Sequence, residues 1–208
     1  MLSEILQQRR SVRKYLTKEP PKEWLEDLIN CGRTAPSPSN SQPVRVRQIV
    51  SEKARKELQS AMVRQKDHLI STITAQNGSK RVRNYIRVYY RYSEFMFTAP
   101  WLILIGVTDA GAGFKDHLVA AGLHPAKSRS STDEDITVGL FVSAMLLRAT
   151  ELGIGSCILT APLVFLALEK NLTMFHDLTP KCFVTFGYAA KTPAIPPRFE
   201  LAKIFKSY

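Results

Sequence analysis

The sequence is poor in cysteine, and its three cysteines are isolated from one another. Cys31, Cys157 and Cys182 form no C-x-x-C pair, and the four histidines form no H-E-x-x-H motif, so the chain lacks the ligand spacing of a zinc site. Cys157 and Cys182 lie in apolar stretches, which predicts buried and unreactive thiols. We therefore predict no metal site.

Long hydrophobic runs are also absent. The longest apolar stretches, VGLFVSAMLL and TAPWLILIGV, are too short to cross a bilayer. The opening residues, MLSEILQQRR, contain no apolar region of the kind that directs secretion. These absences predict a soluble, intracellular protein of the cytoplasm that makes no membrane contact.

Motifs for catalysis by the protein's own side chains are missing. The chain has no GxGxxG after a strand and no GxxxxGK[ST], which argues against Rossmann and P-loop proteins. It has no GxSxG, and no serine or cysteine stands beside an obvious base. Helix capping explains the acidic cluster at 133–135. We assign no catalytic side chain, and if the protein is an enzyme, a cofactor should carry out the difficult step.

Acidic residues are scarce relative to basic ones. The chain has 29 Lys and Arg against 18 Asp and Glu, a formal net charge of +11, and residues 64–94 contribute +5 of it. This excess favours an anionic partner, and nucleic acid, an acidic substrate, a phosphorylated cofactor or an acidic redox protein would each satisfy it. Residues 80–97 mix Arg with Tyr. They either recognise an anionic or aromatic substrate or form a solvated helix whose tyrosines pack inward.

Hydrophobic periodicity predicts both helices and strands, without regular βαβ alternation. The predicted helices cover residues 2–9, 21–33, 52–66, 80–97, 136–152 and 162–171. The predicted strands cover residues 44–50, 100–107, 153–159 and 181–189, while 109–131 reads as a loop and 132–135 as a capping box. The fold class is therefore α+β, with a central, mainly antiparallel sheet flanked by helices. Residues 1–208 should form one domain, with 64–97 a basic, Tyr-rich variable segment and 190–208 an extended tail.

The helix predicted after residue 136 is apolar almost all round between 138 and 147. Such a helix has no face suited to water. It should lie either at the centre of the fold or between two subunits.

Three short stretches could bind a phosphorylated cofactor. Arg9, Arg10 and Arg13 surround Ser11 near a helix end, where fixed cations suit a phosphate. The stretch APSPSNSQP at 35–43 offers hydroxyls, an amide and free backbone donors. In PPRF at 196–199, two prolines restrain a single arginine.

Taken in order along the chain, four motifs resemble the FMN-dependent nitroreductase family. They are RRSVRKY, then RTAPSPSNSQP after a helix, then ELGIGSCIL, and finally FVTFGYAAKTPAIPPR, together covering about residues 8–200. The resemblance implies a nitroreductase-like fold in an intertwined homodimer, with two FMN sites at the subunit interface.

The resemblance also implies a role for each matching residue. Arg9 and Arg198 would hold the FMN phosphate, Arg10 and Ser11 would lie along the phosphate and ribityl chain, and Arg13 would reach the pyrimidine edge of the flavin. The residues lining the isoalloxazine, or that of the partner subunit, would be Pro36, Ser37, Pro38 and Asn40. Those passing its other side, with backbone groups near N5, would be Ile158, Leu159 and Thr160.

The implied reaction is ping-pong: hydride passes from NADH or NADPH to N5 of FMN, and from there to a small acceptor. That acceptor would be an aromatic, quinone or nitro compound, anionic or aromatic in character. Where the family often has Trp after Gln-Pro, this chain has Val44, and Thr160–Ala161 replace Glu-Gly of the most studied branch. Dehalogenation or dehydrogenation on the same fold is therefore an alternative. A basic nucleic-acid-binding module ranks lower, since no RRM, OB or helix-turn-helix signature occurs.

Overall fold

In the computed structural model, residues 2–108, 114–123, 132–169 and 172–207 are described. Four strands form the central sheet: β1 (Val44–Gln48), β2 (Trp101–Val107), β3 (Gly155–Leu159) and β4 (Thr179–Gly187). Their order across the sheet is β1-β2-β4-β3, and each neighbouring pair is antiparallel. The predicted α+β class with an antiparallel sheet is confirmed, and β1 and β3 are its two opposite edges.

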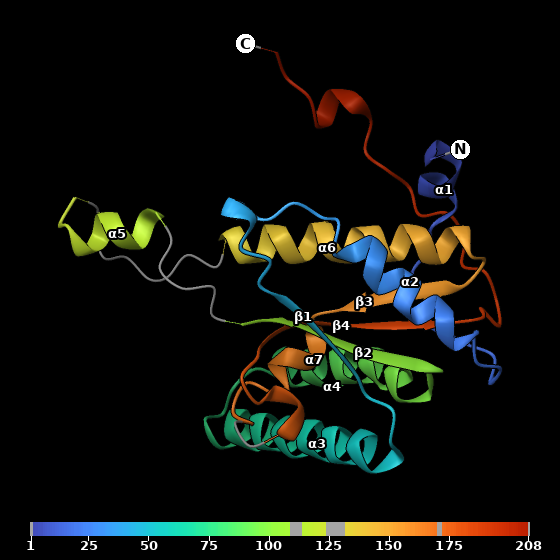
Figure 1. Cartoon of the computed structure of the whole chain (residues 1–208). Coiled ribbons are helices and arrows are strands. Elements are labelled where there is room, and N and C mark those ends of the chain that lie inside the picture. The colour runs from blue at the N-terminus through green and yellow to red at the C-terminus, as the bar shows by residue number, and fades with distance from the viewer. Residues whose placement is uncertain (1, 109–113, 124–131, 170–171, 208) are drawn as a thin grey trace.

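The helices lie in two layers, one on each face of the sheet (Figure 1). One layer holds α2 (Lys22–Gly32) and α6 (Thr132–Glu151); the other holds α3 (Glu52–Ala75), α4 (Lys80–Glu94) and the short α7 (Ala161–Val164). The remaining helices are α1 (Leu2–Gln8) and α5 (Phe114–Ala120).

The apolar core divides into two clusters, one under each helix layer. Strand β2 separates them, since all seven of its residues are buried and its side chains alternate between the two faces. Cys182 belongs to the cluster under α2 and α6, and Cys157 to the cluster under α3 and α4. Both thiols are buried, as predicted.

Four sequence-based boundaries were wrong. Helix α3 continues to Ala75 rather than ending at 66, because Leu69 packs into the cluster that α3 shares with α4. Residues 132–135 lie inside α6 instead of before it, and Glu134 and Asp135 pair with Lys181 of β4 at 2.8 and 2.9 Å.

Helix α7 ends at Val164 rather than at 171. The chain turns there, and the turn places Phe165 and Leu166 in the core. The predicted loop at 109–131 contains α5 and a turn at 121–123, while 109–113 and 124–131 lie outside the described residues.

Helix α6 has a buried face and an exposed face, although its sequence is apolar almost all round. Phe141 and Met145 are buried, whereas Ile136 and Leu140 are exposed. Helix α1 and the tail after residue 190 run past the same layer (Figure 1), and their large apolar side chains are exposed as well. Within one chain, this side of the molecule is therefore left uncovered.

Candidate functional site at the β3 edge

The segment that carries the arginines lies against the outer edge of β3. Ser11 forms a parallel bridge with Ser156, and the amide of Val12 donates to the Ser156 carbonyl at 2.9 Å. The approach is close because residue 155 is glycine. A Cβ atom there would lie 2.6 Å from a methyl carbon of Val12. The sequence GIGSC thus lets the arginine segment pack beside the strand.

Tyr15 fixes the other end of this segment. Its hydroxyl donates to the Val12 carbonyl at 2.8 Å and lies 2.8 Å from the Thr185 hydroxyl on β4. The amide of Leu16 donates to the Tyr188 carbonyl at 2.9 Å. Burial raises the pKa of Tyr15, so the phenol stays protonated. The segment between Ser11 and Leu16 is held at both ends.

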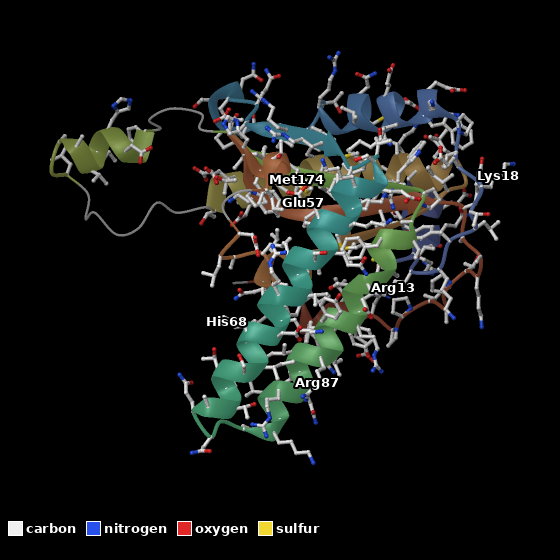
Figure 2. The ribbon with its side chains drawn as sticks, turned by 90° about the horizontal axis from the view of Figure 1, so that it is seen from below. Arg13, Lys18, Glu57, His68, Arg87 and Met174 are labelled. Carbon is white, nitrogen blue, oxygen red and sulfur yellow. The ribbon has the colours of Figure 1, made fainter. Side chains whose placement is uncertain are left out.

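The arginines of this segment are not neutralised by carboxylates. The backbone bridge between Ser11 and Ser156 places the arginine segment beside β3. Burial raises the pKa of the Cys157 thiol on that strand, and the charges of Arg13 and Arg9 act against the rise. Figure 2, which views the molecule from below, labels Arg13 together with Arg87 of α4. Within the described residues, none of Arg9, Arg10 and Arg13 forms an ion pair.

Arg10 differs from the other two arginines. Its guanidinium group donates to the backbone carbonyls of Gln7 and Arg9. Arg10 therefore closes the end of α1, and Arg9 and Arg13 are the two arginines of the segment whose guanidinium groups make no hydrogen bond with another described residue.

Strand β3 presents its last residues to this edge in different ways. Ile158 is 42% exposed, whereas the side chain of Leu159 packs into the core and is 7% exposed. Thr160, at the strand end, is exposed. Leu159 can consequently meet a ligand only through its backbone, while Ile158 and Thr160 can also use their side chains.

A cavity of about 510 Å³ lies next to Thr160, between α4 and α7. Its walls include Tyr85 and Tyr89 of α4 and Phe165 after α7, and its surface is mostly apolar. Sequence reasoning had singled out the Tyr-rich segment but could not place it against Thr160.

The reading of that segment as a helix with inward-packed tyrosines holds for one tyrosine only, and substrate recognition stays a prediction. Tyr90 packs inward edge-on against Phe165, with ring centroids 5.7 Å apart, while Tyr85, Tyr89 and Tyr92 remain exposed.

The loop before β1 has an unusual backbone. Ser39, Asn40 and Gln42 have positive φ angles of 51°, 55° and 46°, a conformation that costs free energy for residues with a Cβ atom. The Ser37 hydroxyl accepts from the amide of Gln42 at 3.0 Å, and the Asn40 side chain accepts from that of Gln42 at 3.1 Å. The loop is thus held in a defined, strained shape.

This loop does not join the arginine segment within one chain. It leads into β1, which lies at the opposite edge of the sheet from β3. Pro36, Pro38 and Asn40 are exposed there, and Ser37 is half-buried. Arg198 is likewise exposed, in the tail, and makes no hydrogen bond or ion pair with the described residues. The structure brings together the predicted residues of segments 9–13 and 158–160 only.

Two further classes of site were searched for in the described residues. No group of three or more His, Cys, Asp or Glu side chains is arranged to hold a metal ion. None of the helices in that part of the chain combines the length and hydropathy of a membrane span.

Comparison with known proteins identifies the fold. The family model described as the Nitroreductase family matches residues 6–188. A BluB-like flavoprotein from Clostridium difficile 630 superposes with a TM-score of 0.78 at 18% identity, over 100% of this chain and 99% of that one. A nitroreductase with bound FMN from Desulfitobacterium hafniense DCB-2 gives 0.68 at 17% identity, over 100% and 97%. The NADPH:FMN oxidoreductase from Vibrio harveyi complexed with NAD+ gives 0.69 at 15% identity, over 99% and 76%.

Proposed function

Since the chain belongs to the nitroreductase family, we propose that it is an FMN-dependent oxidoreductase. It would take hydride from NADH or NADPH and reduce a small aromatic, quinone or nitro acceptor. The observation that carries this proposal is the pair of arginines, Arg9 and Arg13, held beside β3 without carboxylate partners among the described residues.

The residues at the β3 edge suit the phosphate end of FMN. A phosphate monoester carries between one and two negative charges at neutral pH, and arginine binds it through charge-assisted hydrogen bonds. Arg9 supplies such donors, and Ser11 adds a hydroxyl. Ser156 is the residue that bridges to Ser11. Its side-chain oxygen is buried and has no hydrogen-bond partner among the described residues, so one polar group at this edge is still unbonded.

The far end of β3 suits the flavin ring. Thr160 lies four residues beyond Ser156, about 13 Å at roughly 3.3 Å per residue in a strand. Arg13 keeps its charge at any working pH. Placed at the pyrimidine edge, it would favour the negative charge that a reduced flavin gains there. The backbone of Ile158, Leu159 and Thr160 would face N5.

Bound FMN would supply the two-electron chemistry of the ping-pong reaction. The protein's part is to hold the cofactor and to offer the acceptor a place beside it. The cavity next to Thr160, lined by Tyr85 and Tyr89, is apolar and aromatic-walled, which favours a flat aromatic or quinone acceptor.

A second copy of the chain would complete the site. Within one chain, the loop at 35–43 and Arg198 lie away from Arg9, and the side of the molecule formed by α1, α6 and the tail exposes large apolar residues, including Phe199 at 76% and Leu2 at 63%. Apolar surface of this extent is typical of a subunit interface. We infer a homodimer in which the partner contributes the loop and Arg198.

The test begins with the purified protein and its visible spectrum. A yellow protein that bleaches when NADH or NADPH is added without oxygen, and recovers its colour with a quinone or a nitroaromatic, supports the proposal. A yellow protein that stays oxidised would require another electron donor. A colourless protein that also refuses added FMN would overturn the assignment. A high 260/280 absorbance ratio removed by salt would instead indicate bound nucleic acid.

A further inference from the structure

Helix α4 carries far more positive charge than its own packing requires. It has five cations and one acid: Lys80, Arg81, Arg83, Arg87, Arg91 and Glu94. None of the five cations forms an ion pair with another described residue. Three of them lie in the first four residues of the helix, where the helix dipole disfavours cations. Cations in the first turn of a helix, where the dipole opposes them, favour an anionic partner outside the helix.

One of these arginines is held against a residue in the wall of the acceptor cavity. The Nε of Arg81 donates to the Tyr85 hydroxyl at 3.0 Å, and the guanidinium carbon lies 5.4 Å from the centre of the Tyr85 ring. Tyr85 itself lines the cavity beside Thr160. The two terminal nitrogens of Arg81 have no hydrogen-bond partner among the described residues. A fork of this shape, fixed by its neighbour, suits a phosphate.

Two other cations of α4, Arg83 and Arg87, bond to neighbouring residues of the chain. Arg83 donates to the Gly78 carbonyl at 2.7 Å, which ties the start of α4 to the turn after α3. Arg87 reaches the Asn84 side chain at 3.4 Å, away from the cavity wall. Arg81 is one helical turn before Tyr85, and Tyr85 one turn before Tyr89, so the three share a face. Arg81 is thus the cation that continues the cavity wall.

We propose that Arg81, positioned by Tyr85, binds the 2′-phosphate of NADPH and so makes NADPH the preferred hydride donor. The inference rests on the proposed function. A nicotinamide ring that enters the cavity would leave the adenosine half of the dinucleotide outside it, where Arg81, which contacts the wall residue Tyr85, could reach it. NADPH carries a phosphate monoester on that half and NADH does not. A contact with this phosphate therefore separates the two donors.

The first test measures binding without turnover, with 2′,5′-ADP and 5′-AMP as probes of the adenosine half. Isothermal titration calorimetry on the purified protein should give at least roughly tenfold tighter binding of 2′,5′-ADP, the size expected of a charge-assisted contact. Arg81→Gln should remove most of that preference. Arg91→Gln, which removes the same charge from the same helix, should preserve it. Equal losses in both variants, or no preference in the wild type, would overturn the proposal.

Tyr85→Phe tests the positioning role. It keeps the aromatic ring and removes the hydroxyl that accepts from Arg81, so the preference for 2′,5′-ADP should fall by less than in Arg81→Gln. An unchanged preference would show that Tyr85 does not position the arginine. Near-ultraviolet circular dichroism should confirm that all three variants are folded.

Steady-state kinetics then connect binding to the reaction. In Arg81→Gln the KM for NADPH should rise about tenfold while kcat and the KM for NADH change little, because the contact is to a remote phosphate. An equal rise for both nucleotides would place Arg81 at the shared pyrophosphate and refute the selectivity. These results are separable from failure of the proposed function, since flavin content is read from the spectrum and 2′,5′-ADP binding needs no reduction.

Discussion

Each edge of the sheet has a cavity or groove nearby and arginine side chains beside it, but the arginines at the two edges bond to different partners. At the β1 edge, a groove of about 780 Å³ lies between α2 and the start of α3, lined in part by Leu25, Glu52 and Arg55. It is larger than the cavity of about 510 Å³ beside Thr160. By size alone, the β1 edge would be the functional site.

The arginine of the β1 groove is fully occupied with the protein's own backbone. Arg55 donates to the carbonyls of Ile49, Phe97, Ala99 and Pro100 at 3.3, 3.0, 2.8 and 3.0 Å. Burial lowers the pKa of Arg55, the expected effect of removing a cation from water. This arginine joins the ends of β1 and β2 and leaves little donor capacity for a ligand.

At the β3 edge the arrangement is reversed. Arg9 and Arg13 are held in place by the backbone pairing of Ser11 and by Tyr15, while their guanidinium groups have no carboxylate partner among the described residues. The comparison indicates that unused hydrogen-bond donors on a restrained backbone, and not cavity volume, separate the proposed binding site from the groove whose arginine is structural. Four predictions test it.

Arg55→Met should have the largest effect, and on stability. Removing the guanidinium leaves four partly buried carbonyls without a donor, which should lower the free energy of unfolding by about 3 kcal/mol. Urea denaturation measures the change. FMN affinity of the folded fraction should be unaffected. Lys53→Met, an exposed neighbour on α3, is the control and should change stability by less than about 0.5 kcal/mol. Loss of flavin binding in the folded Arg55→Met variant would contradict the view that Arg55 has a structural role only.

Arg9→Ala should show the opposite pattern. FMN binding should weaken by about 2 kcal/mol, which is more than tenfold in the dissociation constant, because a charge-assisted contact to the phosphate is lost. Fluorescence titration of the apoprotein with FMN measures it. The urea midpoint should stay close to that of the wild type, since the Arg9 side chain has no hydrogen-bond or ion-pair partner among the described residues. A flavin affinity equal to wild type would contradict the phosphate assignment.

Arg13→Ala should change the flavin's redox balance more than its binding. Without a cation near the pyrimidine edge, the two-electron reduction potential should fall by about 30 mV, equivalent to about 1.4 kcal/mol. Redox titration of the bound flavin against a reference dye gives the value. Arg13→Lys keeps the charge and should restore most of the potential. If the potential of Arg13→Ala matches the wild type, the ring-edge role is wrong.

Tyr15→Phe should have the smallest effect, of about 1 kcal/mol on unfolding, because one hydroxyl loses its contacts with Val12 and Thr185. The variant loosens the backbone that holds the arginines without removing a charge. Urea denaturation should reveal the loss, and FMN affinity should fall by less than in Arg9→Ala. A decrease as large as that of Arg9→Ala would mean that positioning, rather than charge, dominates binding.

The fold class and most elements could be predicted from the sequence because their signals are local. The apolar run WLILIGV predicts a central strand, and β2 is buried throughout. Gly153, which follows the long helix, has a φ of +73°, a conformation that glycine adopts readily at a helix end. The extension of α3 and the shortness of α7 were missed because distant packing decides them.

The candidate site could be predicted only in part for the same reason. The motifs around Arg9 and Ile158 mark it, and the structure brings these two segments together. The role of Tyr15 depends on Thr185, which is 170 residues away, and no local pattern reveals such a partner. Arg81, which is held by Tyr85, and Arg55, whose donors are bonded to backbone carbonyls, look alike in the sequence, since each lies near a helix start among other cations. Only their neighbours in space separate them.

The pairing of Ser11 with Ser156 has a consequence for the order of folding. The proposed cofactor site is formed where the segment that contains Ser11 pairs with β3, and Tyr15 connects the same segment to β4. Contacts this distant in sequence close large loops and tend to slow folding. During synthesis, β4 is among the last elements to leave the ribosome. Capture of the flavin would therefore follow the completion of the chain, and the yellow colour would report a fully assembled sheet.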